Sequence, residues 1–180
     1  AVKAAYDIEG PVYIRINRGF DQVIYKNVDD CKFEWDKSTL MNDGTDITVI
    51  ACGSCVFEAM QAARIAKADG GLSVRVINMH TIKPIDREAV LKAVAETRRI
   101  ITVEDHEVMG GLGSAVAEVV AESGKGCAFK MLGHQNAFST IGLQEDLLAL
   151  AKIDANGIAE TIQEMMHADF EADDDWADEF

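Results

Sequence analysis

Short apolar runs rich in β-branched residues recur along this chain of 180 residues at nearly even intervals. Residues 47–51, 74–77 and 100–103 are the clearest such runs, and residues 128–132 form a weaker fourth. Short runs bounded by turn residues are typical of strands that are buried on both faces, as in a parallel sheet. Residues 12–16, which alternate between apolar and polar or aromatic side chains, predict one further strand.

Apolar stripes at helical spacing fill the gaps between these runs. The first stripe follows Ser54 and stops at the glycine pair 70–71. Four similar stripes begin near Asp86, Ser114, Gly142 and Asp154. Ser54, Asp86 and Asp154 have the side chains of helix N-caps. Strands that alternate with helices in this way predict βαβ units, so we expect an α/β fold with a mostly parallel sheet and helices on both faces.

Residues 17–45 form one long stretch without a regular pattern. A loop of this length is unusual inside a compact domain, so we interpret it as a linker between two domains. The chain begins without a methionine, in what reads as a helix already under way, which indicates a piece of a longer polypeptide. We therefore expect four parts: the end of a preceding domain at 1–18, a linker at 19–45, a compact domain at 46–167 and a tail at 168–180.

The charge of the chain restricts its partners. The net charge is −14, and half of it comes from seven acidic residues, with no basic one, in the segment 168–180. Self-repulsion predicts a disordered tail there, and a docking segment for a partner is the alternative. A chain this acidic repels nucleic acid and anionic lipid, and it has no apolar run long enough to span a membrane. Four irregularly spaced cysteines and the lack of a secretory signal favour a reducing compartment, and we expect a cytoplasmic protein.

Polar residues follow the predicted strands, at the end of a parallel sheet where ligands collect. They are Cys52, Cys55, His80, Glu104, Asp105, His106 and His134. We expect this strand-end rim to hold a site or an interface with another domain, and the ordinary polarity of loops is the alternative. A metal site is disfavoured because the histidines are single and widely spaced. A thioredoxin-like redox site at Cys52 and Cys55 is disfavoured because the order of elements is wrong.

Residues 110–114, Gly-Gly-Leu-Gly-Ser, open a predicted helix just after a strand, where N–H groups could bind phosphate. The third glycine of the dinucleotide fingerprint would fall on Val116, and the Walker lysine is missing. Neither Ser54 nor Ser114 lies in a G-x-S-x-G motif. The sequence therefore supports neither a nucleotide site nor a hydrolase, and these glycines suit a tight turn with close packing.

Several segments resemble the motifs of transketolase C-terminal domains, in the same order. They are TVIACGS at 48–54, NMHTIKPID at 78–86, TVEDH at 102–106 with GGLGSAV at 110–116, and a last motif that starts at Phe138. Residues 10–14 and Arg18 are similar to the closing strand of the pyrimidine-binding domain that comes before it in that family. The resemblance covers residues 10–165 and implies a three-layer sandwich with a mostly parallel five-stranded sheet.

The resemblance implies a homodimeric parent enzyme that moves two-carbon ketol units between sugar phosphates, as in the pentose phosphate pathway, with thiamine diphosphate and Mg. The Gly-Asp-Gly and Asn motif that holds the cofactor diphosphate is absent, so we expect the cofactor to be bound outside this segment. In the family an arginine after the closing strand contacts the substrate phosphate. Arg18 matches it, although Asn17-Arg18-Gly19 departs from the common Ser-Arg-Gln, and Arg15 is the alternative ligand.

The resemblance assigns no catalytic and no metal-binding residue to this segment. His80, Glu104, His106 and His134 are expected at an interface, or behind the residues that form a site. We expect the chain to need the upstream domains or subunit of the same enzyme and to be inactive alone.

Other members of the superfamily remain alternatives. Deoxyxylulose-phosphate synthase and the β subunits of 2-oxo-acid dehydrogenases share the architecture, and the histidine at 106 favours transketolase, particularly its split two-subunit form. A non-catalytic module that docks partners through its acidic tail is the competing class. Deletion of residues 168–180 separates the two classes, because only the docking module would lose its partner.

Overall fold

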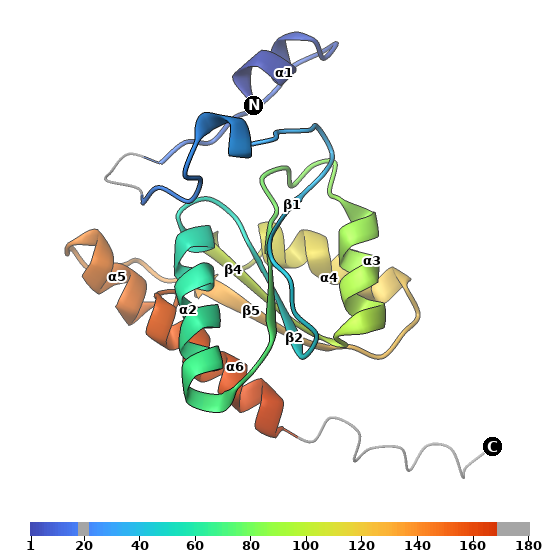
Figure 1. Ribbon diagram of the computed structural model, residues 1–180. Helices are drawn as coiled ribbons and strands as arrows, with labels where there is room; N and C mark the ends of the chain where they lie inside the picture. The colour runs from blue at the N-terminus through green and yellow to red at the C-terminus, as the bar shows by residue number, and fades with distance from the viewer. Residues whose placement is uncertain (18–21, 169–180) are drawn as a thin grey trace.

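The computed structural model describes residues 1–17 and 22–168, which form a five-stranded sheet with helices on both faces (Figure 1). Along the sheet the strand order is β1-β3-β2-β4-β5. The strands are β1 (Thr39–Asn42), β2 (Ile47–Ala51), β3 (Val74–Asn78), β4 (Arg99–Glu107) and β5 (Ala128–His134). Only β1 runs antiparallel to its neighbour, and the other three pairings are parallel. The expected mostly parallel five-stranded sheet is thereby confirmed.

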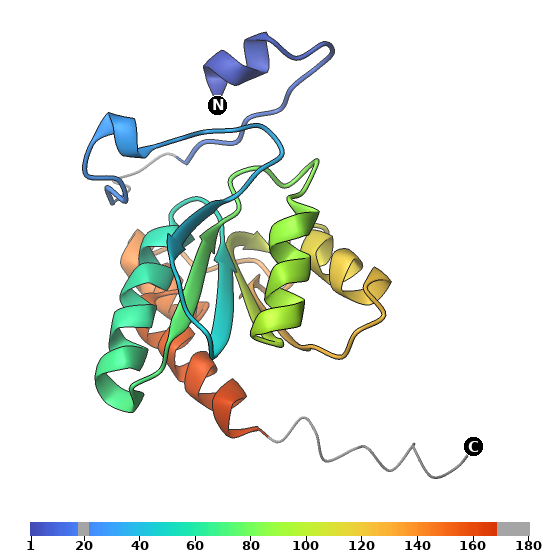
Figure 2. The same ribbon diagram turned by 45° about the vertical axis from the view of Figure 1, so that its right-hand side comes forward.

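The helices form the two outer layers of a sandwich (Figure 2). Helices α2 (Cys55–Gly70) and α6 (Ala155–His167) pack side by side on one face, with α5 (Gln144–Leu150) at their end. Helices α3 (Arg87–Glu96) and α4 (Leu112–Glu122) cover the other face. Two short elements, α1 (Val2–Tyr6) and the 3-10 turn Val28–Asp30, belong to the N-terminal segment, which lies beyond the carboxyl ends of the strands.

Each layer of helices buries its own hydrophobic cluster against the sheet. Ile47, Val49 and Ala51 of β2 face the cluster that contains Ile158 and Ile162 of α6. Ile50, which lies between Val49 and Ala51, points to the opposite face of the sheet and joins the cluster of α3 and α4. All five β2 residues are buried, as expected of a central strand in a parallel sheet. Burial of each large aliphatic side chain contributes about 1.5–3 kcal/mol, so this core fixes the sheet that carries the rim.

Most of the expected helix boundaries are confirmed. Asp86 accepts a hydrogen bond from the N–H of Ala89 at 3.1 Å, and Asp154 accepts one from the N–H of Gly157 at 3.0 Å. Gly71 ends α2 with a left-handed φ of 67°, which glycine adopts without strain. Ser54 precedes α2, but its side chain makes no capping hydrogen bond.

The sequence misplaced one strand of the sheet. Residues 39–42, expected within the linker, form β1 and pair with β3, with a register shift between Leu40 and Asn42. Only alternate residues of this edge strand meet the core, and Leu40 stays 55% exposed, so no continuous apolar run marks it. Residues 11–17, expected to include a strand, form neither strand nor helix, because among the described residues no strand pairs with them. The other boundaries of the four expected parts remain predictions.

None of the helices within residues 1–17 and 22–168 is both long enough and apolar enough to cross a lipid bilayer.

Candidate functional site at the strand-end rim

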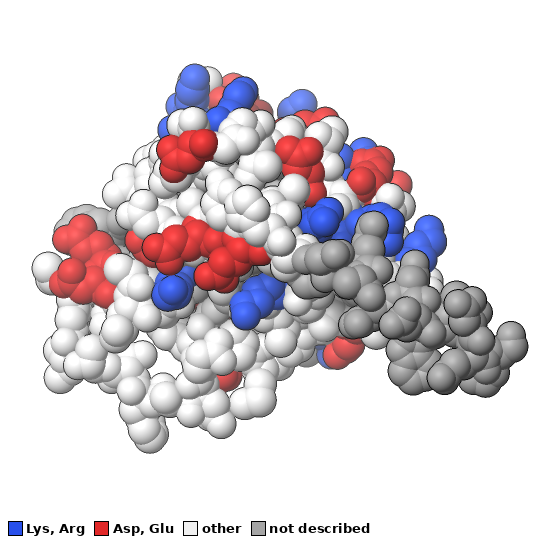
Figure 3. Space-filling model, turned by 90° about the horizontal axis from the view of Figure 1, so that it is seen from below, with Lys and Arg blue, Asp and Glu red and all other residues white. Residues whose placement is uncertain are grey.

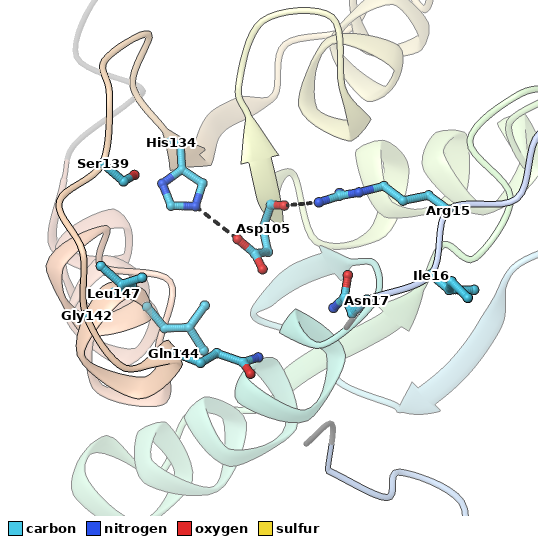
Figure 4. A pocket seen from close by; sticks show the side chains of 10 residues that line it. Arg15, Ile16, Asn17, Asp105, His134, Ser139, Gly142, Gln144 and Leu147 are labelled. Atoms are coloured by element: carbon cyan, nitrogen blue, oxygen red, sulfur yellow. Dashed lines mark hydrogen bonds and ion pairs between the residues drawn. The ribbon is translucent and has the colours of Figure 1, made fainter. Parts of the chain in front are cut away.

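A pocket of about 450 Å³ opens at the carboxyl end of the sheet (Figure 4). It lies between the N-terminal segment, the end of β4, and the loop that joins β5 to α5. Its walls are formed by Arg15, Ile16, Asn17, Asp105, His134, Ser139, Gly142, Gln144, Leu147 and Leu148. Polar groups thus gather at the mouth, and Leu147 and Leu148 supply an apolar wall.

A side-chain contact between neighbouring strands forms one wall of this pocket. Nε2 of His134, at the end of β5, lies 2.9 Å from Oδ1 of Asp105 in β4. Both side chains are partly exposed, at 27% and 32%. The pair forms because β4 does not stop at Val103 as the apolar run suggested: its pairing with β5 resumes at Glu107 and His134. Glu104, Asp105 and His106, which we expected after the strand, therefore lie within it.

The N-terminal segment is tied to the rim by two side chains. The Nη2 group of Arg15 donates to the carbonyl oxygen of Asp105 at 2.9 Å (Figure 4). Nδ2 of Asn17 donates to Oγ of Ser54, just before α2, at 3.2 Å. These contacts join residues far apart in the sequence and bring the segment that precedes Arg18 to the edge of the sheet. Arg18 itself lies outside the described residues.

Glu104 occupies the glycine-rich turn rather than the pocket. Its carboxylate is 2% exposed and accepts hydrogen bonds from the N–H groups of Leu112 and Gly113, both at 2.7 Å. These are N–H groups of the first turn of α4, which have no partner within the helix. Any side chain at Gly111 would collide with the same carboxylate. Because Glu104 already satisfies these donors, this turn does not fit the diphosphate of a cofactor.

The other two histidines of the rim do not reach the pocket. His106 is 46% exposed, and its Nδ1 lies 2.8 Å from the carbonyl oxygen of Glu107 and 3.9 Å from Oε2 of Glu104. His80 follows β3, which is separated from β4 by β2. Its ring contacts the ring of Phe33 at a tilt of 37°, with centroids 4.5 Å apart, and its Nδ1 lies 3.0 Å from Oγ1 of Thr81. Burial lowers the pKa of His80, which favours the neutral ring.

The cysteines at the start of α2 are not poised for redox chemistry. Burial is the main cause that raises the pKa of the Cys52 thiol to about 12, and it raises the pKa of Cys55 as well. A redox-active pair needs a depressed pKa, because the thiolate is the nucleophile. The burial of these thiols therefore gives no support to the redox hypothesis, which the sequence already disfavoured.

Within the described part of the chain, no three His, Cys, Asp or Glu side chains come close enough together to hold a metal ion.

Sequence reasoning found some residues of the pocket and missed others. His134 was identified, whereas Asn17 and Gln144 were not, because an isolated amide in a loop carries no periodic signal. Asp105 pairs with His134 because β4 continues past Val103. The residues of this extension are polar, so the apolar pattern of the sequence did not predict it. Ser139 and Gly142 were noted only as parts of the motif that starts at Phe138, and not as residues of a pocket.

This fold and rim define a class: three-layer α/β domains whose strand ends form a site together with a neighbouring chain segment. The family model for the transketolase C-terminal domain matches residues 36–158, and the chain belongs to that family. The match includes β1, in agreement with its place in the sheet.

Three comparisons illustrate the family. A putative transketolase C-terminal section from Methanocaldococcus jannaschii is 38% identical over 92% of this chain and 51% of its own length. A 1-deoxy-D-xylulose-5-phosphate synthase from Heliobacterium modesticaldum is 30% identical over 93% of this chain and 26% of its own length. Among solved structures, a split-gene transketolase described as an inactive β4 tetramer superposes with a TM-score of 0.84 and 34% identity, over 92% of this chain and 53% of that one. The chain thus spans about half the length of the Methanocaldococcus relative and about a quarter of the length of the synthase.

Proposed function

We propose that the chain is the C-terminal domain of a transketolase that transfers two-carbon ketol units between sugar phosphates, and that it acts only together with the upstream part of that enzyme. The observation that carries this proposal is the attachment of the N-terminal segment to the rim, through Arg15 and Asn17. Arg18, the residue that matches the family's phosphate ligand, follows Asn17 directly in the sequence. A split-gene relative of the same fold supports a function shared between subunits.

Thiamine diphosphate supplies a carbanion-stabilising centre wherever it is bound in such an enzyme. We propose that its site, and that of Mg, lie outside this segment, because Glu104 fills the glycine-rich start of α4 at the rim. The residues described here would hold and orient the sugar phosphate and the neighbouring domains.

Within this proposal the two arginines have different roles. Arg15 uses Nη2 to hold the carbonyl oxygen of Asp105, so it anchors the segment. Arg18 then binds the substrate phosphate, for which a planar guanidinium is suited. His134 and Asp105 hold the wall of the pocket next to Arg15.

Exposed apolar side chains next to the pocket support a contact with the rest of the enzyme. Phe138 and Ile141, in the loop between β5 and α5, are fully exposed, and Leu143 is 67% exposed. Tyr13 and Ile16 of the N-terminal segment are also more than 80% exposed. Apolar side chains grouped in this way mark interaction surfaces. The proposed occupants are the upstream domains and a second copy of the enzyme.

The test is a comparison of arginine variants in the intact parent enzyme. We expect Arg18→Ala to raise the KM for a sugar phosphate by roughly 10- to 100-fold, the loss expected for one charge-assisted phosphate contact. Arg64→Ala, on the exposed surface of α2, is the matched control and should leave KM unchanged. An Arg18→Ala enzyme with an unaltered KM for the phosphorylated substrate would refute this role of Arg18.

A second candidate is the parent enzyme 1-deoxy-D-xylulose-5-phosphate synthase, which the 30% identical relative favours. The two candidates differ in product and in length: the chain covers 51% of the transketolase relative and 26% of the synthase relative. Formation of 1-deoxy-D-xylulose 5-phosphate by the native enzyme would select the synthase.

A further inference from the structure

The two edges of the sheet differ in what lies against them. At the edge where the strands begin, acidic and basic side chains lie next to one another (Figure 3). The pocket of about 510 Å³ at that edge has balanced charges in its lining, namely Asp46, Glu96, Arg98 and Arg99. At the carboxyl edge, residues 22–38 lie beyond the strand ends and then turn down into β1 (Figure 2). We call residues 22–38 the strap.

Two side-chain contacts fasten the strap to β3 and to the loop that follows it. The hydroxyl of Tyr25 accepts a hydrogen bond from Nδ2 of Asn78, the last residue of β3, at 3.1 Å. Asn78 is 7% exposed, so this bond satisfies a buried amide. Further along the strap, the ring of Phe33 contacts the ring of His80, with centroids 4.5 Å apart. An aromatic contact of this kind adds to the stability gained from the buried area alone.

The end of the strap is fastened to the start of α3. Ser38 donates its N–H and its Oγ–H to Oδ2 of Asp86, both at 2.8 Å. Lys37 pairs with Glu88 at 3.3 Å, although this pair is exposed to solvent and contributes little. The strap contains no glycine, whereas flexible linkers are rich in glycine and serine. Contacts from its start to its end therefore give this stretch, which the sequence predicted to be part of a linker, one fixed course along the domain.

The chain upstream of the strap forms one wall of the rim pocket. Arg15 donates to the carbonyl oxygen of Asp105 at 2.9 Å, and Asn17 donates to Oγ of Ser54 at 3.2 Å. Both bonds lie at or near the surface, where a hydrogen bond contributes little net stability. Cys52 lies close to this wall, since the charge of Arg15 acts to lower the pKa of its thiol, against the stronger effect of burial. The accessibility of Cys52 therefore reports whether the wall is in place.

We propose that the strap holds this wall of the rim pocket in place, so that Tyr25 and Phe33 are positioning residues for a pocket that neither of them lines. The reason is the length of chain that is free to move. With the strap fastened, 8 positions separate Asn17 from the anchor at Tyr25; with the strap released, 22 positions separate Asn17 from Thr39, the first residue of β1. The entropy cost of closing a loop of n residues grows as (3/2)RT ln n, so release of the strap weakens the attachment of the wall roughly fivefold. The inference is independent of the function proposed for the rim, because it concerns the chain without substrate.

Two rates measured on the full chain test this proposal. Limited trypsin cleavage after the exposed Lys32 reports whether the strap is fastened, and alkylation of Cys52 by iodoacetamide at pH 9 reports whether the wall is in place. Tyr25→Ala combined with Phe33→Ala removes a hydrogen bond and an aromatic contact from the strap. Cleavage after Lys32 should then be faster by about fivefold or more, because proteolysis follows the population of the released strap. Alkylation of Cys52 should be roughly fivefold faster, as the longer free loop implies.

The matched control is Tyr6→Ala combined with Phe138→Ala, since both of these rings are exposed, at 90% and 107%. It should change neither rate. Equal cleavage after Lys32 in the control and in the strap variant would overturn the proposal, because the two contacts would then not fasten the strap. Faster cleavage with an unaltered Cys52 rate would overturn it as well, because the wall would then stay in place without the strap.

A second variant removes no contact, so it decides the question even where the double substitution impairs folding. Insertion of eight Gly and Ser residues between Gln22 and Val23, which are both exposed, doubles the connection between the wall and the first anchor of the strap. Each doubling of a flexible loop weakens its closure about threefold. Cys52 should therefore react roughly threefold faster, while cleavage after Lys32 stays the same. A Cys52 rate that the insertion leaves unchanged would refute the coupling between strap and wall.

Discussion

At the scale of single residues, Glu104 shows how a buried charge can serve structure in a domain of this kind. Its two oxygens satisfy the N–H groups of Leu112 and Gly113 and lie at the positive end of α4. We expect Glu104→Ala to lower the free energy of unfolding by about 2–4 kcal/mol, because two buried donors lose their acceptor. Glu104→Gln keeps one acceptor oxygen and should cost about half as much.

Urea denaturation of the three proteins measures both values. Equal stability of Glu104→Ala and the parent chain would show that water or another side chain replaces the carboxylate. Glu104 would then no longer account for the close approach of β4 and the glycine-rich turn.

The cysteines of the domain should differ strongly in reactivity. Burial raises the pKa of Cys52 to about 12, so almost none of it is thiolate at pH 7. Its alkylation should stay slow from pH 7 to 9 and accelerate only as the pH approaches 12, whereas the exposed Cys31 reacts readily. Mass analysis of alkylated peptides follows both sites at once. A Cys52 that reacts at pH 7 as fast as Cys31 would revive the redox hypothesis.

At the scale of elements, Asp86 joins helix α3 to the residue before β1, the strand that the sequence did not predict. Its Oδ2 accepts the N–H and Oγ–H of Ser38, just before β1, both at 2.8 Å, and its Oδ1 caps α3 through Ala89. We expect Asp86→Ala to destabilise the domain by about 2 kcal/mol, as the loss of a cap and its partners implies. Ser38→Ala, which removes only one of these bonds, is the matched control.

The same carboxylate makes stability depend on pH. Burial acts to raise the pKa of Asp86, but the hydrogen bonds from Ser38 and Ala89 outweigh it and hold the pKa below its usual value. A depressed folded-state pKa contributes stability above the unfolded value of about 3.9, and this stability is lost as the pH falls through the folded pKa. Unfolding measured from pH 6 to pH 2 should therefore show a smaller loss of stability in Asp86→Ala than in the parent chain. A parallel loss in both proteins would contradict this account.

The elements also show where sequence reasoning succeeds and where it ends. The central strands were predictable because β2 and β3 are buried on both faces and so carry runs of mostly apolar, β-branched residues. Edge strand β1 carries only a half-buried alternation, and the end of β4 is polar because it faces the rim. The contact of Asp105 with His134 joins residues 29 positions apart, and the contact of Arg15 with Asp105 joins residues 90 positions apart. No local pattern in the sequence indicates such contacts. The sequence therefore predicted only that polar residues gather at the carboxyl ends of the strands, and not which of them contact one another.

At the scale of the whole molecule, the two ends of the sheet have different chemistry. The strand-end rim has a pocket that contains the contact of His134 with Asp105, and exposed apolar side chains lie beside it, which fits a contact with further domains. The opposite edge, where the strands begin, has a second pocket with Glu96, Arg98 and Met166 among its lining residues. Purified alone, the chain should show no ketol transfer between sugar phosphates under conditions in which an intact transketolase is active, because the cofactor site is proposed to lie elsewhere. Turnover comparable to that of the intact enzyme would contradict this.

The measurement that tests the central claim most directly is the mass of the native polypeptide in its source cells, detected with an antibody against this domain. A C-terminal domain of a transketolase predicts a band well above 19.6 kDa, the mass of this chain. Because the chain covers 51% of its transketolase relative and 26% of its synthase relative, the size of the band also separates a split subunit from a longer enzyme. A single band at 19.6 kDa would mean that the domain is free-standing, and this would contradict the proposal that it forms part of a larger catalytic chain.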